Sequence, residues 1–280
     1  NGQNNVVANS GPFIIAPYFA LQKGLNDTIK VNNGNEFNIN STKAAFEAWV
    51  RPYRFPTIGT KFPIIAKVSD NGTLHYSLSL LPTGQLEFSV GDNNGQVRTA
   101  VSDASKPLLE PRTLEDDSTW THIAVTFDRS TTQTQIGFWI DGNLQSESAI
   151  VNQLGTSLTL DSLNEYPTYI GFQPNVGGFV GELREIRFWN NDVNGAANAT
   201  ALRQQIQGAQ SQRLVSGINL VTNFSFNGGG FVNGLTPLSM YSYTIGNSAN
   251  IQTHYFGSGI RYIAARPFLK IVEPMFNEEV

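Results

Sequence analysis

The chain has 280 residues, of which only 14 % are charged, with a formal net charge of −4 and no cysteine. Disulfides and thiolate metal sites are therefore excluded, and the scattered basic residues offer no electrostatic surface for nucleic acid or an anionic membrane. No apolar run reaches the roughly 18 residues that a membrane-spanning helix needs. Because Asn, Ser, Thr, Gln and Gly must supply most of the polar surface, we expect an extracellular or cell-surface β-protein.

The first half of the chain reads as a series of strands with apolar residues at every second position. We expect a hairpin over residues 18–31, a strand in which Phe46, Ala48 and Val50 share one face, and a meander over residues 64–68, 74–81 and 85–90. The turns of this meander contain Asp70-Asn71-Gly72 and Pro82-Thr83-Gly84, which are residues that reverse a chain. A short strand at residues 97–101 follows.

The clearest pattern is the segment WTHIAVTFDRSTTQTQIGFWIDG at residues 120–142. Ile123, Val125 and Phe127 alternate with polar or small residues, and so do the apolar residues at 136, 138 and 140. This pattern predicts a β-hairpin that buries one face of each strand. Asp141-Gly142 supplies the positive φ angles of a tight turn into a further strand.

Further strands are expected at residues 157–160, 168–172, 179–189 and 220–226. Leu183 is out of phase with Ile186 and Phe188, which predicts a β-bulge between them. A single short helix is expected to begin at an Asn194 cap and to end at Gly208. We place one domain over residues 1–227, and a β-rich extension over residues 228–280 that either packs on it or starts another module.

Four segments carry a family resemblance: the hairpin above, AFEAWVRP at residues 45–52, YSLSLLPTGQLEFSVGD at 76–92 and GGFVGELREIRFWN at 177–190. In this order they resemble the laminin G-like and pentraxin-like members of the concanavalin A-like lectin/glucanase superfamily. The resemblance implies an all-β fold, a two-sheet antiparallel jelly-roll sandwich with one short helix. It is much less specific for function.

Aromatic residues on predicted loops are the candidates for ligand binding. Residues 53–63 and 106–119 form connections that are longer than neighbouring strands need, and long loops often carry binding residues. Sugars stack on aromatic rings while their hydroxyls bond to polar side chains. The candidate residues are Tyr53, Arg54, Phe55, Phe62, Tyr166 and Phe172. The alternative is that these rings close the open ends of the sandwich.

Calcium is the cofactor that the turns could hold, because hard cations take oxygen ligands from loops. The candidate ligands are Asp70, Asn71, Asp92 and Asn93. Each of these residues is also common in turns, where its side chain bonds to the nearby backbone. The resemblance implies a pentraxin-like calcium loop near residues 171–178, but the sequence GFQPNVGG has no carboxylate there. A double calcium site of that kind is therefore not expected.

Catalytic alternatives are weaker. Glu182 and Glu185 could act as the paired carboxylates of a glycoside hydrolase, but Leu183 and Arg184 stand where the superfamily's glucanases need a third acid. An ion pair with Arg184 or Arg187 is the simpler interpretation. His122 lies inside a strand without a partner His or Cys nearby, so we expect a hydrogen-bonded structural histidine.

The leading functional hypothesis is a non-catalytic, lectin-like recognition module that binds carbohydrate, with glycans or glycosylated proteins as partners. A second hypothesis is a structural or adhesive spacer domain of a larger surface protein, without a small ligand. A third is a glycan-degrading enzyme, which the carboxylate pattern does not favour.

Overall fold

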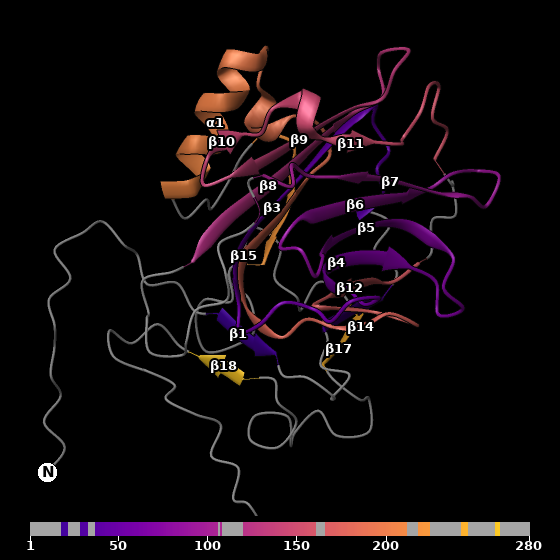
Figure 1. The fold of residues 1–280 in the computed structure, drawn as a ribbon, viewed down its shortest axis with the longest axis vertical. Helices are drawn as coiled ribbons and strands as arrows, with labels where there is room; N and C mark the ends of the chain where they lie inside the picture. Colours follow the sequence, from indigo (N-terminus) through magenta and orange to yellow (C-terminus); the bar gives the residue numbers. More distant parts are fainter. Residues whose placement is uncertain are drawn as a thin grey trace, which may run out of the picture.

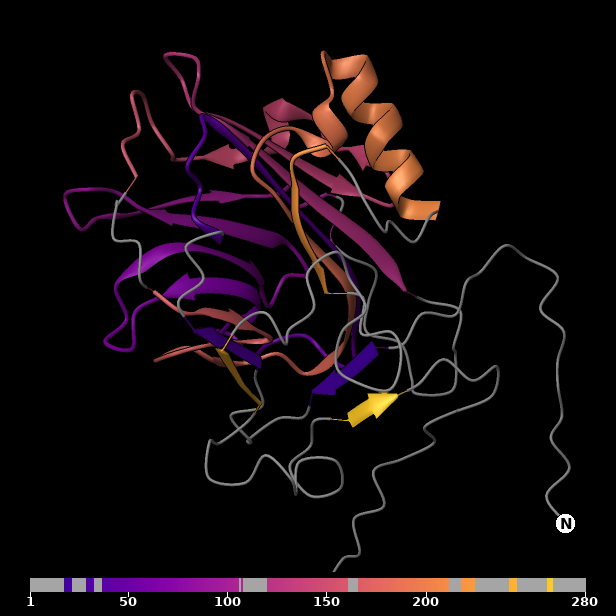
Figure 2. The ribbon, with the colours of Figure 1, turned by 180° about the vertical axis from the view of Figure 1, so that it is seen from behind.

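The computed structural model describes residues 18–21, 29–32, 37–105, 107, 120–160, 166–211, 218–224, 242–245 and 261–263. Two large antiparallel sheets lie face to face (Figure 1), which is the expected jelly-roll sandwich. The only α-helix among the described residues, α1 (Ala199–Ser211), lies on the outer side of one sheet (Figure 2). The predicted fold class is confirmed.

Sheet A carries α1 on its outer face and has the strand order β10-β9-β8-β3-β15-β1-β18, with β16 also paired to β15. Its strands are β1 (Tyr18–Leu21), β3 (Lys43–Pro52), β8 (Thr121–Asp128), β9 (Gln135–Ile140), β10 (Asn143–Leu144), β15 (Gly181–Trp189), β16 (Leu220–Phe224) and β18 (Arg261–Ile263).

Sheet B has the order β11-β7-β6-β5-β4-β12-β2-β17. Its strands are β2 (Ile29–Asn32), β4 (Phe62–Val68), β5 (Leu74–Leu80), β6 (Leu86–Gly91), β7 (Val97–Val101), β11 (Val151–Asn152), β12 (Thr168–Ile170) and β17 (Ser242–Ile245). A separate two-stranded ribbon is formed by β13 (Phe172–Gln173) and β14 (Gly177–Gly178).

The central hairpin and the meander are confirmed. β8 and β9 pair from Ile123 opposite Ile140 to Asp128 opposite Gln135, and the turn after β9 has positive φ at both Asp141 (47°) and Gly142 (74°). Two positive φ angles are what a two-residue hairpin turn requires, so Asp-Gly explains the immediate return into β10.

Two strand predictions were wrong. β1 and β2 do not form a hairpin with each other, because β1 joins sheet A and β2 joins sheet B. Residues 157–160 make only an isolated bridge from Leu160 to Asp92, and the edge of sheet B is completed by β11 instead. Alternation over three or four residues predicts an extended backbone but does not identify its partner.

Apolar side chains from both sheets form one core between them. Phe46 on β3 lies at its centre, with its ring 4.7 Å from that of Tyr76, 5.1 Å from Phe188 and 5.5 Å from Phe88. These rings come from both layers, and Phe46 is only 1 % exposed. Tilted ring pairs at these separations add to the gain from apolar burial.

The predicted β-bulge lies in β15. Its register against β3 shifts between Arg184 and Arg187, and Glu185 has a φ of 49°. The extra residue changes the phase of the strand, so that Leu183 before the bulge and Ile186 and Phe188 after it all reach the core.

The helix begins later than predicted. Asn198, not Asn194, is the cap, because its Oδ1 accepts a hydrogen bond from the Ala201 N–H at 2.9 Å. Asn194 belongs to a preceding 3₁₀ turn, η3 (Val193–Gly195). Gly208 continues the helix, which ends at Ser211. The predicted apolar face is confirmed, since Leu202 and Ile206 pack together against sheet A.

The C-terminal region supplies an edge strand to each sheet. β17 pairs with β2 in sheet B, and β18 pairs with β1 in sheet A. The boundary at residue 227 stays a prediction, as does a separate module over residues 228–280. The predicted loop at residues 106–119 lies outside the described residues except for Pro107.

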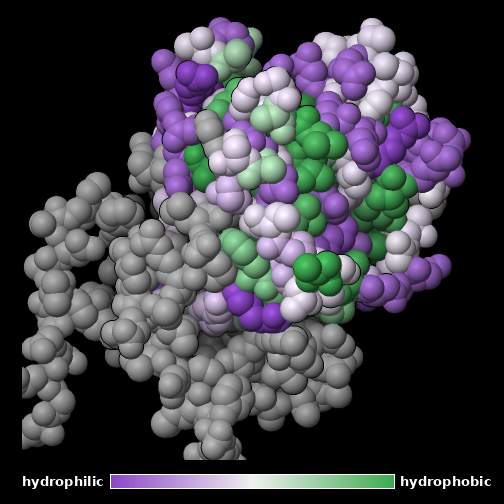
Figure 3. Space-filling view, viewed as in Figure 1, coloured by the Kyte–Doolittle hydropathy of each residue, from purple (hydrophilic) through white to green (hydrophobic). Residues whose placement is uncertain are grey.

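The visible surface mixes apolar and polar residues without a continuous apolar area (Figure 3). Among the described residues, one large apolar side chain is almost wholly exposed: Ile58, at 96 %, in the connection from β3 to β4. Within the described part of the chain, no helix is long and apolar enough to cross a membrane.

Phe46→Ala should lower the free energy of unfolding by about 3–5 kcal/mol, because it leaves a cavity among three other rings. Ile58→Ala provides the matched control and should change stability by less than about 0.5 kcal/mol, since nearly the whole side chain is in solvent. Urea unfolding followed by tryptophan fluorescence measures both. Equal losses for the two variants would contradict the position assigned to Phe46.

Candidate functional site

Four residues predicted to bind sugar lie together where β3 passes to β4; we call Tyr53, Arg54, Phe55 and Phe62 the rim group. Tyr53 and Phe55 are half-buried and pack against the core. Phe62 is 6 % exposed and meets Phe179 edge-on at 6.0 Å. The Arg54 guanidinium lies 5.2 Å from the centre of the Phe62 ring. Packing uses much of these rings, and their ligand-binding role stays a prediction.

The rim group also meets the start of the second long connection. Gly84, in the turn between β5 and β6, has a φ of 77°, and a Cβ added there would lie 3.0 Å from both Phe55 and Pro107. Glycine at this turn therefore allows the two connections to come together. The acidic residues at 115–117 lie outside the described residues.

Tyr166 and Phe172 have other neighbours. Phe172 is half-buried against a small cluster that includes Ala66 and Tyr169, with its ring 5.8 Å from that of Tyr169. Tyr166 is half-buried, and its backbone carbonyl accepts a hydrogen bond from Lys67 Nζ at 2.6 Å. Of the six predicted residues, the structure brings Arg54 and Phe62 into contact, and it places Tyr166 and Phe172 among other neighbours.

The first predicted calcium turn contains Asp70 and Asn71, both exposed. The Asp70 carboxylate accepts hydrogen bonds from Lys30 Nζ at 2.8 Å and from the Tyr169 hydroxyl at 2.6 Å. The hydrogen bond from Lys30, followed by that from Tyr169, lowers the pKa of Asp70. This carboxylate is therefore already neutralised by a lysine.

The second turn is organised by Asp92, while Asn93 is exposed. Asp92 Oδ1 accepts the backbone N–H groups of Asn94 and Gln96, each at 2.9 Å, and Oδ2 lies 3.0 Å from Arg98 Nε. The hydrogen bond from the Gln96 backbone is the largest cause of its lowered pKa. Both oxygens of this carboxylate have protein partners.

These turns fit calcium poorly as they stand. Calcium takes about six to eight oxygen ligands, whereas no group of three or more His, Cys, Asp or Glu side chains suited to a metal occurs among the described residues. An ion at Asp70 or Asp92 would also have to displace Lys30 or Arg98. Calcium binding stays a prediction.

The carboxylate considered for catalysis has a structural partner. Glu185 is 3 % exposed, and its Oε2 lies 3.1 Å from Arg187 Nη2. The expected ion pair is confirmed at this position. The Glu182 side chain lies outside the described part of the structure.

A buried polar cluster lies on the outer face of sheet A. Glu47 is at its centre, and its Oε2 accepts a hydrogen bond from Trp189 Nε1 at 2.8 Å. Arg187 Nη1 lies 3.7 Å from the same oxygen. His122 Nε2 lies 3.7 Å from the other carboxylate oxygen, Oε1. Burial raises the pKa of Glu47. Burial, assisted by the charge of Arg187, lowers the pKa of His122 to about 3. His122 is therefore neutral at physiological pH.

His122 is structural, as expected, but the expected hydrogen bond is missing. Neither ring nitrogen has a hydrogen-bond partner among the described residues. The ring instead meets Trp49 edge-on, with 5.3 Å between the ring centres. Aromatic packing, rather than a polar bond, holds this imidazole in place.

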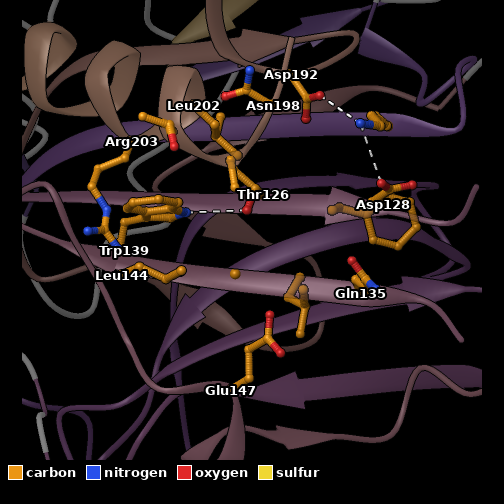
Figure 4. Close-up of a pocket in the computed structure, with 16 residues that line it drawn as sticks. Thr126, Asp128, Gln135, Trp139, Leu144, Glu147, Asp192, Asn198, Leu202 and Arg203 are labelled. Carbon is orange, nitrogen blue, oxygen red and sulfur yellow. Dashed lines mark hydrogen bonds and ion pairs between the residues drawn. The ribbon is translucent and has the colours of Figure 1, made fainter. Parts of the chain in front are cut away.

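A pocket of about 450 Å³ lies between α1 and the outer face of sheet A, and we call it the helix pocket (Figure 4). β8 and β9 form its floor, and Asp192 together with residues between 198 and 203 forms its opposite wall. None of the predicted ligand-binding residues lies in it. The pocket combines charged, amide, hydroxyl and apolar side chains.

The floor of the helix pocket depends on a glycine. Trp139 Nε1 donates a 3.3 Å hydrogen bond to Thr126 Oγ1 on the neighbouring strand. A Cβ added at Gly137 would lie 2.6 Å from that oxygen and 3.2 Å from Trp139 Nε1. Glycine thus allows the indole to lie against β8. Because Trp139 is 2 % exposed, it is a fixed floor and not an open stacking surface.

One end of the helix pocket is closed by ion pairs. Lys43 Nζ on β3 lies 2.8 Å from Asp192 Oδ2 and 3.5 Å from Asp128 Oδ2. The hydrogen bond to Asp192 is the largest cause of the raised pKa of Lys43. Asp128 Oδ1 also accepts bonds from the Ser130 N–H and hydroxyl. These contacts tie β3, β8 and the segment before α1 together.

Other polar groups of the helix pocket are available to a ligand. Gln135, Glu147 and Arg203 are exposed, and their side chains make no hydrogen bond or ion pair with another described residue. Leu144 and Leu202 are half-buried beside Trp139. The pocket therefore presents donors, acceptors and a small apolar surface to one small volume.

Stability should rise with pH between about 3 and 6.5 because of His122. Below pH 6.5 His122 binds a proton in the unfolded chain, whereas in the folded protein it stays neutral down to about pH 3. Between these two pH values the free energy of unfolding therefore rises by up to about 1.4 kcal/mol per pH unit. Glu47 has the opposite effect on stability. Because its pKa is raised in the folded state, its contribution to the free energy of unfolding falls as pH rises.

Comparing the pH dependence of stability in the wild type and in His122→Gln gives the contribution of the histidine alone. The difference in free energy of unfolding between pH 4.5 and pH 6.5 should be smaller in the variant, as measured by urea unfolding. Parallel pH profiles for the two proteins would contradict the lowered pKa of His122.

If calcium binds the turns at Asp70 or Asp92, millimolar calcium should raise the melting temperature modestly, because an ion that binds only the folded state stabilises it. Chelator should reverse the rise, and Asp92→Asn should reduce it. Differential scanning calorimetry measures each. Coincident melts with calcium and with chelator would leave both segments as ordinary turns.

The chain resembles known structures at low sequence identity. No curated protein matches the chain. A Bacteroides ovatus structure assigned to carbohydrate binding is 17 % identical, with a TM-score of 0.51 over 78 % of this chain and 54 % of that one. A heptameric pentraxin of Limulus polyphemus is 11 % identical, with a TM-score of 0.46 over 86 % and 99 %.

The chain spans about half the length of the Bacteroides ovatus protein, and identities this low show the fold alone. The sequence match is broader. The laminin G family model described as "Concanavalin A-like lectin/glucanases superfamily" matches residues 23–197, which is more than half of the chain. The chain therefore belongs to the concanavalin A-like lectin/glucanases superfamily.

Proposed function

We propose that the protein is a non-catalytic glycan-binding module that holds a sugar unit in the helix pocket. The observation that carries this proposal is the set of unengaged polar groups, Gln135, Glu147 and Arg203, beside the apolar side chains of Leu144 and Leu202. A pocket of about 450 Å³ also lies within the range of roughly 300–1,000 Å³ usual for small-ligand sites.

A sugar matches this chemistry because each hydroxyl both donates and accepts hydrogen bonds. Glu147 can accept, Arg203 can donate, and the Gln135 amide can do both. The C–H face of the ring can pack on Leu144 and Leu202. Since Trp139 is almost fully buried, hydrogen bonds rather than ring stacking should supply most of the affinity.

The carboxylates support a binding rather than a hydrolytic role. Glycoside hydrolysis needs an acid and a second carboxylate on either side of the bond. Asp128 and Asp192 share Lys43, and Glu185 pairs with Arg187. Among the described residues of the helix pocket, Glu147 is the one carboxylate without a partner.

An extracellular or cell-surface location, with glycans or glycosylated proteins as partners, belongs to this proposal. The low content of charged residues, with Asn, Ser, Thr, Gln and Gly supplying most of the polar surface, agrees with it. The Bacteroides ovatus protein of similar fold is itself assigned to carbohydrate binding.

Glycan-array screening followed by calorimetry with the best-bound oligosaccharide tests the proposal. Gln135→Ala should weaken binding by about 0.5–1.5 kcal/mol, the usual contribution of one neutral hydrogen bond. Arg203→Ala should weaken it as well. Gln96→Ala, an exposed glutamine in the turn between β6 and β7, is the matched control and should bind like the wild type.

The results also separate the alternatives. If Tyr53→Ala or Phe55→Ala weakens binding without lowering the melting temperature, while Gln135→Ala has no effect, the rim group is the site. If the folded protein retains no glycan, the adhesive spacer hypothesis replaces this one. Turnover of a bound oligosaccharide would contradict the non-catalytic role.

A further inference from the structure

We infer that the helix pocket selects uncharged sugar units and discriminates against units that carry a carboxylate. This inference rests on the proposed glycan binding and adds a ligand class to it. The side chains that line the pocket include three carboxylates, on Asp128, Glu147 and Asp192, and two cations, on Lys43 and Arg203. The lining therefore has an excess of one negative charge.

Lys43 cannot act as an independent anion receptor. Its ammonium lies within 3.5 Å of both Asp128 and Asp192, and these carboxylates are only 24 % and 17 % exposed. A ligand carboxylate that approached Lys43 would meet two fixed negative charges at the same place. Partial burial weakens the screening of that repulsion by solvent.

Glu147 adds a third negative charge on another side of the pocket. It lies in the 3₁₀ turn η2 (Glu147–Ala149) and is exposed, and its carboxylate has no partner among the described residues. A sugar hydroxyl can donate to this carboxylate, and a carboxylate on the sugar cannot. The same group thus favours a neutral ligand and opposes an acidic one.

Arg203 is the cation that could reverse this preference. Figure 4 shows it beside Trp139, at the end of the pocket away from Asp128 and Asp192. Arg203 on α1 and Glu147 are both exposed, so water and salt screen these two opposite charges alike, and the excess negative charge comes from the partly buried group of Lys43, Asp128 and Asp192. The net charge of −4 for the whole chain acts in the same direction as the pocket.

The test uses pairs of oligosaccharides that end in glucose or glucuronic acid, and in galactose or galacturonic acid, with calorimetry at low salt. Each neutral member should bind about three- to tenfold more tightly than its acidic counterpart, the size expected for one unit charge about 4 Å away in a water-like dielectric. Glu147→Gln should narrow this ratio, and so should added salt. Glu87→Gln, outside the pocket and paired with Lys61 at 2.7 Å, should leave the ratio unchanged.

Equal binding of the paired ligands, or a ratio that Glu147→Gln leaves unchanged, would overturn the selectivity while leaving the proposed glycan binding intact. A preference for the acidic member that Arg203→Gln removes would overturn it too. Failure of every glycan on the array and in these pairs to bind would instead overturn the proposed function itself.

Discussion

Burial of both faces of β3 is the constraint on which the other parts of the structure depend. Its inward residues, Ala44, Phe46, Ala48 and Val50, join the core between the sheets. On the outward face, Ala45 packs with Trp139, Trp189 and Ile206 of α1, and Glu47 is 1 % exposed. A strand at the surface of a sandwich normally leaves one face in water. β3 does not leave a face in water, so other side chains must cover its outward face and its charged groups must have partners.

Because those charges are paired within the protein, only the remaining polar groups are available to the proposed ligand. Glu47 is held by Trp189 and Arg187, and Lys43, at the start of β3, is held by Asp128 and Asp192. A charge as deeply buried as that of Glu47 would cost several kcal/mol without partners, and the ammonium of Lys43 is already taken by two carboxylates, so these groups are committed to the fold. Gln135, Glu147 and Arg203 lie farther out, where solvent already satisfies them, and they are free to exchange water for a ligand.

Much of the fold could be predicted from the sequence because its information is local. Alternation in β8 and β9, Asp141-Gly142 and the phase change after Leu183 each specify backbone geometry within a few residues. The partners of β1 and β2 could not be predicted, because the sequence of a four-residue strand does not specify which strand it pairs with. The helix cap was misplaced because Asn194 and Asn198 satisfy the same rule, and only the backbone decides between them.

The candidate site was missed for a related reason. Aromatic residues in long connections suggested a rim, yet the structure packs Tyr53 and Phe55 partly against the core. The helix pocket instead joins side chains more than 150 residues apart in the sequence, from Lys43 to Arg203. Its available signal was Gly137 beside Trp139 on the outward face of β9, a small residue and a large one where a solvated strand would carry polar side chains.

One inserted residue in β15 links the core to this outer surface. Side chains alternate strictly along a strand, so a change of one residue in phase exchanges its two faces. Because of the bulge at Glu185, Ile186 and Phe188 point inward, and Arg187 and Trp189 point outward. Arg187 then reaches Glu47, and Trp189 packs with Ile206 of α1. Without the bulge, Arg187 and Trp189 would face the core, Glu47 would lose both partners, and α1 would have no surface on which to form the wall of the pocket.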